Sequence, residues 1–260
     1  LLKKARADQR YLTEDDVGFT IGPRVNAASR MDNPEDAFEL LIATDMETAS
    51  ERVQHLEGLN QTRKTAVAQI TKDLHKRVKE LAELPPVLVF GSPEWRPSLV
   101  GLAAGKLADE LGRPTFLWGR DGNGAYKGSC RSGGKVSVVE LLRAIPDILL
   151  EHGGHHVAGG FTVRSERIHD FPSALEAAFT TLGETAVHEE EQLIDATLSL
   201  DEVTPLLITD LKKLAPYGTG NPAPLFAFKS VTPTVVEQFG KGKEHLKLQF
   251  ATERGRLEAI

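Results

Sequence analysis

The sequence predicts an α/β protein with a long connecting helix and a smaller all-β region near its end. Residues 46–84 repeat apolar side chains at spacings of three and four, which predicts one continuous helix. Residues 85–186 alternate short apolar runs with amphipathic segments, as strands and helices do around an α/β sheet. From residue 226 onward, polar and apolar residues alternate as in half-buried strands, which predicts a small antiparallel barrel or sandwich.

Two local features refine the helical part of this prediction. Asn33-Pro34 predicts the start of a short helix over 34–44, because asparagine caps helices and proline suits the first helical position. The apolar stripe of the long helix is interrupted by Asn60 and Arg63. That interruption leaves two interpretations, which are a solvated mid-section or an arginine that points into a shared cleft.

A proline pair, Pro85-Pro86, ends the long helix and opens the α/β region, because proline cannot continue a helix. Turn residues and glycines then separate the apolar runs from one another. Residues 217–226 are rich in turn formers and lead into the β region. The expected strands cover 87–91, 114–119, 125–132 and 157–163, and the expected helices cover 98–112, 136–145 and 165–183.

Composition and charge restrict the function classes. Of the 260 residues, 40% are hydrophobic and 26% are charged, which is ordinary for a globular protein. The net charge of -6 argues against general coating of nucleic acid but leaves room for a local basic groove. The chain has one cysteine, Cys130, which excludes a disulfide framework and fits a reducing, cytoplasmic compartment. No apolar run in the sequence is long enough to span a membrane. The chain begins LLKK and ends RLEAI, which we interpret as a fragment of a longer protein.

The segment EHGGHHVAGGFTV, residues 151–163, is the first candidate site. His152, His155 and His156 suggest a metal, but ligands on one helical face need an HxxxH spacing, and the glycines here predict a loop. The alternative is a phosphate or nucleotide cradle at the edge of the sheet, because glycines let backbone N–H groups approach an anion and an imidazole can donate to it. Glycines that only permit tight turns remain the structural alternative. The glycines are Gly153, Gly154, Gly159 and Gly160.

Three further segments carry groups that suit phosphate. GSCRSGGK, residues 128–135, combines serine hydroxyls with the guanidinium fork of an arginine, although it lacks the spacing of a P-loop. IGPRVNAASR, residues 21–30, places two arginines six residues apart, and a structural turn with surface arginines is the alternative. In SPEWRPSLVG, residues 92–101, a serine lies near a helix start, where anions bind, and the tryptophan either stacks on a base or packs. Cys130 is expected to be a small packed side chain rather than a nucleophile.

In this order, the segments resemble the RecJ family, the single-strand-specific exonucleases of the DHH phosphoesterase superfamily. GGHHVAGG resembles the signature of the DHH-associated domain, and YGTGNPAPLF resembles the entry to an oligonucleotide-binding (OB) fold. Two departures are Trp95-Arg96-Pro97-Ser98, where many relatives have WHPG, and Ser29, where they often have glycine. The resemblance covers nearly the whole chain and is carried by GPRVNAASR, LNQTRK, EWRPSLVGLAAGKLADELGRPTFL, GSCRS, GGHHVAGGF and YGTGNPAPLF.

The resemblance implies an architecture and a metal requirement. Residues 1–45 would be the tail of a DHH catalytic domain, 46–84 the connecting helix, 85–186 an α/β DHH-associated domain with a mixed sheet, and 187–260 a truncated OB fold, which is a partial β-barrel. In the family, two manganese or magnesium ions in the DHH domain activate water and clamp the scissile phosphate. No DHH triplet occurs in this sequence, so we expect the two-metal site in a missing N-terminal domain and assign no metal ligand here.

By resemblance, the candidate residues bind substrate. Ser129 and Arg131 would hold the terminal 5′ phosphate, and Arg24 and Arg30 would line the cleft. His155 and the four glycines would form the substrate-binding loop. Further nucleic-acid contacts are expected at Trp95, Arg96, Lys229 and Lys247, with Lys241 and Lys243 as additional OB-fold lysines that serve equally well as surface residues.

We therefore expect part of a single-strand-DNA-specific 5′-to-3′ exonuclease that acts by metal-dependent phosphodiester hydrolysis in DNA recombination and repair. This chain would supply 5′-phosphate and single-strand binding and would be inactive alone. The expected partners are single-stranded DNA with a 5′ end and, beyond it, a single-strand-binding protein or a helicase, with the chain itself a cytoplasmic monomer. The alternatives are a DHH-family oligonucleotide or cyclic-dinucleotide phosphodiesterase, and a non-catalytic nucleic-acid-binding module.

Overall fold

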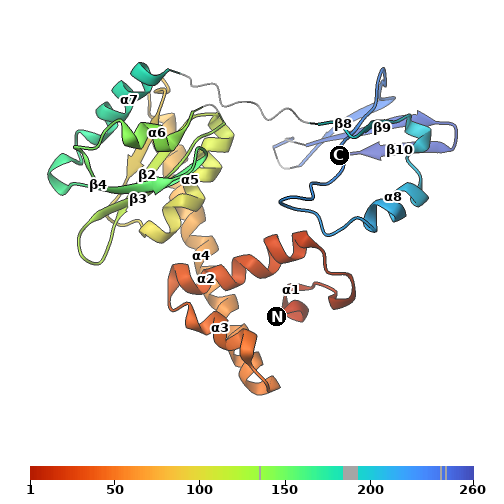
Figure 1. Cartoon of the computed structure of the whole chain (residues 1–260), viewed down its shortest axis with the longest axis horizontal. Helices are drawn as coiled ribbons and strands as arrows, with labels where there is room; N and C mark the ends of the chain where they lie inside the picture. Colours follow the sequence, from red (N-terminus) through yellow and green to blue (C-terminus); the bar gives the residue numbers. More distant parts are fainter. Residues whose placement is uncertain (135, 184–192, 241, 244) are drawn as a thin grey trace. The chain divides into compact units, whose positions relative to one another are not determined.

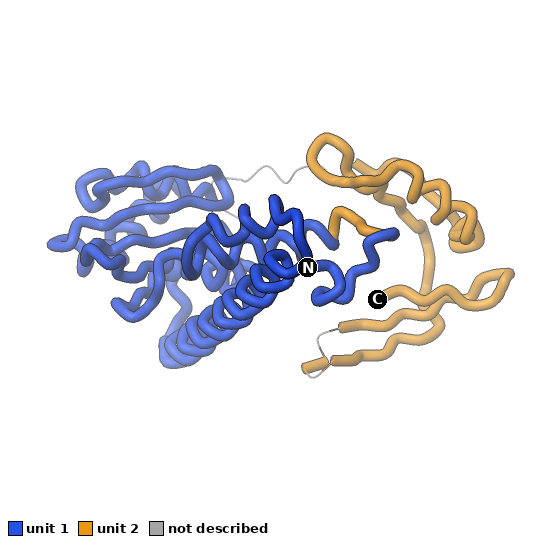
Figure 2. Tube along the Cα trace, turned by 90° about the horizontal axis from the view of Figure 1, so that it is seen from below, with its two compact units in different colours: residues 1–10, 16–189 blue, residues 11–15, 190–260 orange. Residues whose placement is uncertain are grey.

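The computed structural model describes residues 1–134, 136–183, 193–240, 242–243 and 245–260. The chain forms two compact units, residues 1–10 with 16–189 and residues 11–15 with 190–260 (Figure 2). The boundary expected between residues 186 and 187 lies outside the described residues. In the part of the chain that the structure describes, no helix is both long and apolar enough to cross a membrane.

Unit 1 begins with helices. The long helix α4 starts at Met46, and Asp45 caps it by accepting a hydrogen bond from the backbone N–H of Thr48 at 2.8 Å. It ends at Lys79 rather than at residue 84, and Pro85-Pro86 excludes any continuation of the helix beyond them. The elements are α1 (Leu2–Ala5), a 3-10 turn (Gln9–Tyr11), a π-helical turn (Asp16–Ile21), α2 (Gly22–Met31), α3 (Glu35–Ile42) and α4 (Met46–Lys79).

Two predictions for this helical part are resolved by the structure. The expected short helix is confirmed as α3, and IGPRVNAASR lies in the helix α2, so its interpretation as a turn is wrong. Leu56 of α4 packs with Ala28 and Ala37 of these two helices, whereas the later part of α4 packs on α5. Between these contacts, Asn60 is only 3% exposed, so the interpretation of a solvated mid-section is wrong at this residue.

A five-stranded sheet forms the second half of unit 1, in the order β1-β2-β3-β5-β4. Strands β1 and β2 are parallel and all other neighbours are antiparallel, so the sheet is mixed, as expected. One face packs against α4 and α5 (Pro97–Leu111), and the other packs against α6 (Val138–Arg143) and α7 (Phe171–Leu182) (Figure 1). The strands are β1 (Leu88–Gly91), β2 (Thr115–Arg120), β3 (Tyr126–Arg131), β4 (Leu149–Gly154) and β5 (Ala158–Val163).

The expectation of a loop over the first glycines of EHGGHHVAGGFTV is wrong, because residues 149–154 form the edge strand β4. Glycine has a low intrinsic preference for strands, so no local pattern indicates this element. The hydrogen-bonding groups of β4 are instead paired with β5, to which a tight hairpin joins it. The segment thus lies at the sheet edge, as expected, but as part of the sheet itself.

Unit 2 contains short elements and smaller sheets. Strands β8 (Val235–Phe239), β9 (His245–Thr252) and β10 (Gly255–Ala259) form an antiparallel sheet, and β6 (Ala196–Thr197) pairs in parallel with β7 (Phe226–Ala227). Helix α8 (Pro205–Lys212) was not predicted, although Thr204 caps it and a proline occupies its first turn. A 3-10 turn, Leu200–Glu202, precedes it.

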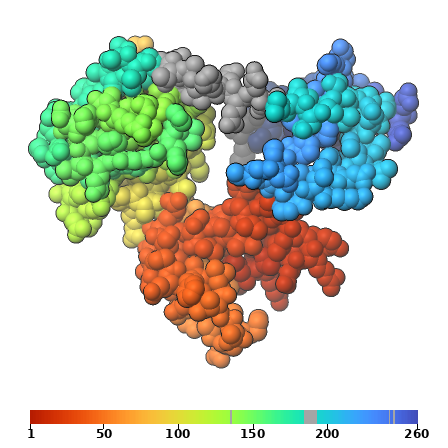
Figure 3. Space-filling model, in the orientation of Figure 1, coloured from red at the N-terminus to blue at the C-terminus, as the bar shows by residue number. Residues whose placement is uncertain are grey.

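The predicted fold class is confirmed. The chain combines a long helix, a mixed sheet covered by helices and a further antiparallel sheet. In the space-filling view, the mixed sheet and its covering helices pack as one continuous body (Figure 3). This rigid sheet is the part of the molecule that positions most of the candidate residues.

Candidate phosphate-binding surface

Three strands of the mixed sheet place small and polar residues in one row. Ser129 of β3 lies opposite Gly160 of β5, and Gly160 lies opposite Gly153 of β4. Residues directly opposite one another share one face of a sheet. The Ser129 hydroxyl therefore has two adjacent exposed glycines beside it.

Helix α5 identifies this face of the sheet. A Cβ added to Gly101 of α5 would lie 3.1 Å from Oγ of Ser129 and 3.3 Å from Nη2 of Arg131, so both side chains point toward α5. Nη1 of Arg131 donates to the carbonyl of Cys130 at 2.7 Å. A guanidinium fixed through one nitrogen keeps further N–H donors for a ligand. The structure thus brings the two residues expected to hold a 5′ phosphate onto the same face.

Arg131 also lines a cavity of about 340 Å³ at the edge of this face. The turn after β3 and the tip of the β4–β5 hairpin form its other walls, and Asp109 of α5 lies on its rim. The backbone N–H of Ser132 donates to the carbonyl of Val157 at 3.0 Å, which ties the turn to the hairpin. Arg131 is therefore held between a helix and two connected turns.

The four candidate glycines fall into two classes. Gly153 and Gly160 face the open side, where a Cβ at Gly153 would meet nothing within 4 Å and one at Gly160 would lie 3.8 Å from the nearest atom. Gly154 and Gly159 face the opposite side. A Cβ at Gly154, whose φ is +144°, would lie 2.3 Å from the carbonyl oxygen of Ala158. A Cβ at Gly159 would lie 3.0 Å from Sγ of Cys130. Packing therefore requires glycine at positions 154 and 159. Gly153 and Gly160 instead leave the surface beside Ser129 uncovered.

His155 lies in the hairpin turn between these strands. Its backbone N–H donates to the carbonyl of Ala158 at 2.8 Å, and the carbonyl of His156 accepts from the N–H of Val138 at 2.9 Å. The His155 residue is exposed. The turn therefore fixes the backbone next to the exposed glycines and leaves the imidazole free to donate to a ligand.

The two arginines of α2 occupy different environments. Arg24 forms an ion pair through Nε with Glu57 of α4, and its Nη1 donates to the carbonyl of Thr20 at 2.6 Å. Arg30 donates to the carbonyl of Ser98 at 2.7 Å, and the Ser98 hydroxyl donates to the carbonyl of Arg30 at 2.7 Å. Arg24 is thus neutralised by a carboxylate, whereas Arg30 is fixed at the N-terminus of α5 by neutral groups only.

Arg63 of α4 lies near Arg30. Its Nη2 donates to Oδ1 of the buried Asn60 at 2.8 Å, and its Nε is buried with no hydrogen-bond partner. Burial lowers the pKa of the Arg63 guanidinium from its usual value, and the positive charge of Arg30 lowers it further. The sequence analysis left Arg63 either in a solvated mid-section or pointing into a shared cleft, and it assigned no ligand to this residue.

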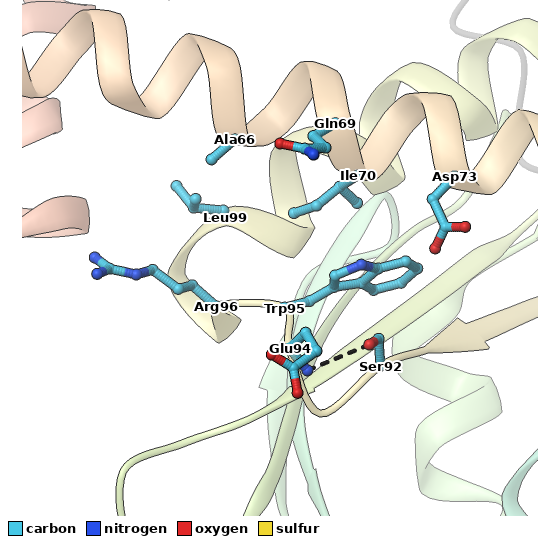
Figure 4. Close-up of a pocket in the computed structure, with 9 residues that line it drawn as sticks. All are labelled: Ala66, Gln69, Ile70, Asp73, Ser92, Glu94, Trp95, Arg96 and Leu99. Carbon is cyan, nitrogen blue, oxygen red and sulfur yellow. Dashed lines mark hydrogen bonds between the residues drawn. The ribbon is translucent and has the colours of Figure 1, made fainter.

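The segment before α5 is largely structural. Trp95 is 7% exposed and its ring lies under the guanidinium of Arg77 at 4.9 Å, so it packs rather than presenting a face for stacking. Arg96 is exposed, and its Nη1 donates to the carbonyl of Met31 at 3.2 Å. Figure 4 shows the cavity of about 570 Å³ between α4 and this segment, where Trp95 and Ile70 lie in the middle and Arg96 points away.

The candidate lysines of unit 2 differ in their contacts. Lys229 is exposed, and Lys247 forms an ion pair with Glu258 of β10 at 3.0 Å. Lys243 lies in an exposed turn with a positive φ of 57°. Lys241 lies outside the described residues.

Cys130 points away from the candidate surface into the core. It is fully buried, and burial raises the pKa of its thiol to about 12. A thiol with such a pKa is protonated at neutral pH and is a poor nucleophile. The expectation of a small packed side chain is confirmed.

One group among the described residues has the composition of a cation site, namely Asp32, Asp36 and His55, whose ligand atoms lie within 4.8 Å of one another. Nε2 of His55 is 3.2 Å from Oδ2 of Asp36 and 3.9 Å from Oδ2 of Asp32. The other oxygen of Asp36 accepts from Nη1 of Arg52 at 3.0 Å. A guanidinium already occupies part of this donor set, so the group does not fit a site for two divalent ions.

Sequence reasoning missed two positions that shape the candidate surface. Gly101 permits the close approach of α5 to Ser129, and the carbonyl of Ser98 orients Arg30. The small residues of SLVGLAAG, at spacings of three and four, are the sequence signal that would have indicated a helix face pressed against a sheet.

Two family models match the chain. The DHHA1 domain matches residues 84–181, and the RecJ OB domain matches residues 194–260. Among curated proteins, the chain is similar to the single-stranded-DNA-specific exonuclease RecJ of Bacillus subtilis, with 30% identity over 100% of this chain and 33% of the relative. The corresponding protein of Haemophilus influenzae is 31% identical over 100% of this chain and 47% of the relative.

A solved structure agrees with these matches. The crystal structure of RecJ in complex with Mn²⁺ from Thermus thermophilus matches with a TM-score of 0.80 and 30% identity, over 100% of this chain and 37% of that chain. This chain thus spans between about a third and a half of the length of these relatives. It belongs to the RecJ family and corresponds to the part of RecJ that carries the DHHA1 and OB domains.

Proposed function

We propose that this chain binds the 5′-phosphorylated end of single-stranded DNA for a single-strand-specific exonuclease that digests in the 5′-to-3′ direction. The row of Ser129, Gly160 and Gly153 beside Arg131 is the observation that carries the proposal. The names of the relatives, which are single-stranded-DNA-specific exonucleases, support the substrate class.

The chemistry of the row suits a terminal phosphate. Arg131 offers a guanidinium fork and Ser129 a hydroxyl on the same face, and both form short hydrogen bonds to phosphate oxygens. Gly153 and Gly160 leave room for the phosphate and sugar to approach the sheet, and His155 at the hairpin tip can donate to either. A terminus held at a fixed point sets the distance to the scissile bond, which accounts for digestion from an end.

The metal chemistry belongs, in this proposal, to the DHH domain, of which residues 1–45 are only the tail. Related RecJ structures contain Mn²⁺ or Mg²⁺, and two such ions would activate water and stabilise the charge on the scissile phosphate. Among the described residues, the one cluster of potential metal ligands, formed by Asp32, Asp36 and His55, does not fit that site. Residues 1–45 are assigned to the tail of the DHH domain, 46–84 to the connecting helix, 85–186 to substrate binding and 187–260 to the OB fold.

The test compares oligonucleotides that differ only at the 5′ end. Fluorescence anisotropy with single strands carrying a 5′ phosphate or a 5′ hydroxyl measures the contribution of the terminus. Arg131→Gln is expected to weaken binding of the phosphorylated strand by about tenfold, the worth of one hydrogen bond to a charged group, and to leave binding of the hydroxyl strand unchanged. Arg143→Gln on α6 is the control, because it removes the same charge from an exposed residue that pairs with Glu140 of the same helix.

Equal affinity of the wild-type chain for the two strands would refute the terminal site. The match of residues 194–260 to the RecJ OB domain favours long single strands over the dinucleotides of a short-oligonucleotide phosphodiesterase. We further propose that the chain is monomeric and cytoplasmic, and that a single-strand-binding protein or a helicase presents the strand to it.

A further inference from the structure

A basic groove of about 580 Å³ runs between the later half of α4 and α5. We call it the α4–α5 groove. Four of its lining residues are lysines, all of them exposed, and none of the described residues that line it carries a carboxylate. The lining residues are Ala68, Thr71, Lys72, His75, Lys76, Lys79 and Lys106.

The lysines of the α4–α5 groove have little counter-charge within the protein. Lys72, Lys79 and Lys106 form no ion pair with another described residue. Lys76 approaches Glu80 only to 3.9 Å, and both side chains are largely exposed, so this contact neutralises little charge. The chain as a whole has a net charge of -6. Four cations gathered around one groove of such a chain produce a local positive potential, which attracts a polyanion.

An ion pair joins the two walls of the groove. Nε2 of His75 on α4 lies 2.8 Å from Oε2 of Glu110 on α5. Glu110 lies four residues after Lys106 on the same helix, but its carboxylate contacts the histidine instead of the lysine. Beneath this pair, Leu74 and Leu107 belong to the apolar core that packs the two helices together. The groove therefore has a fixed base and charged side chains on both walls.

The groove lies on a different side of these helices from the candidate phosphate-binding surface. Lys72 follows Arg63 by about 2.5 turns of α4, at 3.6 residues per turn, so the two side chains point to opposite sides of the helix. On α5, a Cβ at Gly105 would lie 4.0 Å from Cγ of Arg131. Lys106 is the next residue and points about 100° away around the helix. The α4–α5 groove is therefore a separate site.

The lining of the groove selects among polyanions. Among its lining residues, the imidazole of His75 is the one aromatic ring and it is engaged with Glu110, so the bases of a single strand find no stacking surface. The small apolar groups of Ala68 and Thr71 form no pocket for the aromatic or aliphatic anchors of a protein partner. Lysine ammonium groups act as point charges. B-form DNA offers them one phosphate charge per ~1.7 Å of helix axis, twice the density of either strand.

We propose that the α4–α5 groove binds the phosphate backbone of duplex DNA. Lys72, Lys76 and Lys79 lie along the α4 wall, and Lys106 lies on the α5 wall. From residue 72 to residue 79 the helix advances roughly 10.5 Å, at ~1.5 Å per residue. That length corresponds to about three phosphates of one strand, at ~3.4 Å of axis each. Such contacts are independent of sequence. The inference goes beyond the proposed function, which concerns a single strand only.

The test measures binding of the full chain to a blunt duplex with 5′ hydroxyl ends, at several salt concentrations. Lys72→Gln/Lys106→Gln removes one charge from each wall, and the control Lys3→Gln/Lys4→Gln removes the same charge from exposed residues of α1. The groove variant is expected to bind the duplex at least about tenfold more weakly at low salt. The slope of log K against log salt should fall in magnitude by about 2, or about one for each lysine. The control should keep the wild-type affinity and slope.

A charge-preserving variant separates loss of charge from loss of structure. Lys72→Arg/Lys106→Arg keeps both positive charges and is expected to bind the duplex as the wild type does. Both positions are exposed, so thermal melts should give the wild-type Tm for the glutamine and the arginine variants. Weak duplex binding in the arginine variant, with an unchanged Tm, would contradict a site that responds to charge.

Three results would overturn the inference. The first is equal duplex affinity in Lys72→Gln/Lys106→Gln and in the control. The second is a loss of affinity as large for a single-stranded oligonucleotide as for the duplex, because the groove would then hold the single strand. The third is binding of an oligoglutamate peptide that depends on the two lysines, in a chain that does not bind the duplex, because the groove would then belong to an acidic protein.

The same variants distinguish this site from the proposed function. Lys72→Gln/Lys106→Gln is expected to keep the preference for a 5′ phosphate over a 5′ hydroxyl on single strands, and Arg131→Gln is expected to keep the wild-type affinity for the blunt duplex. If the wild type showed no 5′-phosphate preference but bound the duplex through the two lysines, the terminal site would be refuted and the groove supported.

Discussion

Gly153 and Gly160 are positions where one added methyl group is expected to affect the ligand and not the fold. A Cβ at Gly153 would meet nothing within 4 Å, and one at Gly160 would lie 3.8 Å from the carbonyl oxygen of Gly128. Neither glycine has a positive φ. Alanine in a strand interior loses less conformational entropy than glycine, by roughly 0.5–1 kcal/mol. Gly153→Ala and Gly160→Ala are therefore expected to leave Tm unchanged or to raise it by about 1–4 °C.

The two neighbouring glycines provide matched controls. Gly154→Ala would put a methyl group 2.3 Å from the carbonyl oxygen of Ala158 at a φ of +144°, and Gly159→Ala would put one 3.0 Å from Sγ of Cys130. Each strained site is expected to cost on the order of 1–3 kcal/mol. At about 2–4 °C per kcal/mol, Tm is expected to fall by roughly 2–12 °C. The same chemical change thus has opposite effects on stability at adjacent positions.

The effect on strand binding is expected at the two positions where alanine does not lower the stability, Gly153 and Gly160. A methyl group at Gly153 or Gly160 stands on the face beside Ser129 and keeps a phosphate or sugar from the sheet, so affinity for a 5′-phosphorylated strand should fall at least tenfold, or about 1.4 kcal/mol. Anisotropy titrations and thermal melts on the four variants measure both quantities. Wild-type affinity in Gly153→Ala and Gly160→Ala, with folded protein in both, would refute the assignment of this face to the ligand.

Three further predictions concern the histidine, the metal and the cysteine. His155→Ala is expected to weaken binding of 5′-phosphorylated strands severalfold without changing Tm, because its side chain is exposed. A fall in Tm measured by calorimetry would contradict this. The chain incubated with Mn²⁺ and end-labelled single-stranded DNA is expected to release no nucleotides, and steady release on a gel would show that a complete metal site is present after all. The folded state raises the pKa of Cys130 from 9.0 to about 12, so the unfolded thiol ionises first and stability is expected to fall as pH rises through this window. Urea unfolding should show this loss, up to roughly 1.4 kcal/mol per pH unit, and Cys130→Ala should remove it.

The elements that the sequence predicted well are those with a local cause. The long helix follows from apolar spacing and begins at a capping residue, Asp45, whose side chain accepts from the backbone of Thr48. The strands at 88–91 and 115–120 are apolar runs bounded by turn residues. For such segments, side-chain periodicity and breakers decide the structure before any tertiary contact forms.

The elements that could not be predicted from the sequence depend on partners that are distant in the chain. Residues 149–154 form a strand because β5 supplies hydrogen bonds to a glycine-rich backbone that has little strand preference of its own. Asn60 is buried because α2, α3 and α5 pack along one side of α4, which no property of Asn60 reveals. The candidate residues themselves were found by their chemistry, but their alignment in a row required the register of three strands.

That register accounts for the pairing of the glycines. Adjacent residues of a strand point to opposite faces, so each glycine pair places one residue on the face of Ser129 and one on the face of Cys130. Because Gly153-Gly154 lies opposite Gly160-Gly159, Gly153 and Gly160 coincide on one face, and Gly154 and Gly159 coincide on the other. Gly153 and Gly160 leave the surface beside Ser129 open. Gly154 allows the close approach of β5, and Gly159 allows the close approach of Cys130. A single glycine in either strand would meet only one of these needs. His152 lies opposite Phe161, on the other face of the sheet from Gly153 and Ser129. Among the described residues, the one group of side chains close enough to share a metal ion is Asp32, Asp36 and His55, which includes none of the histidines of this segment.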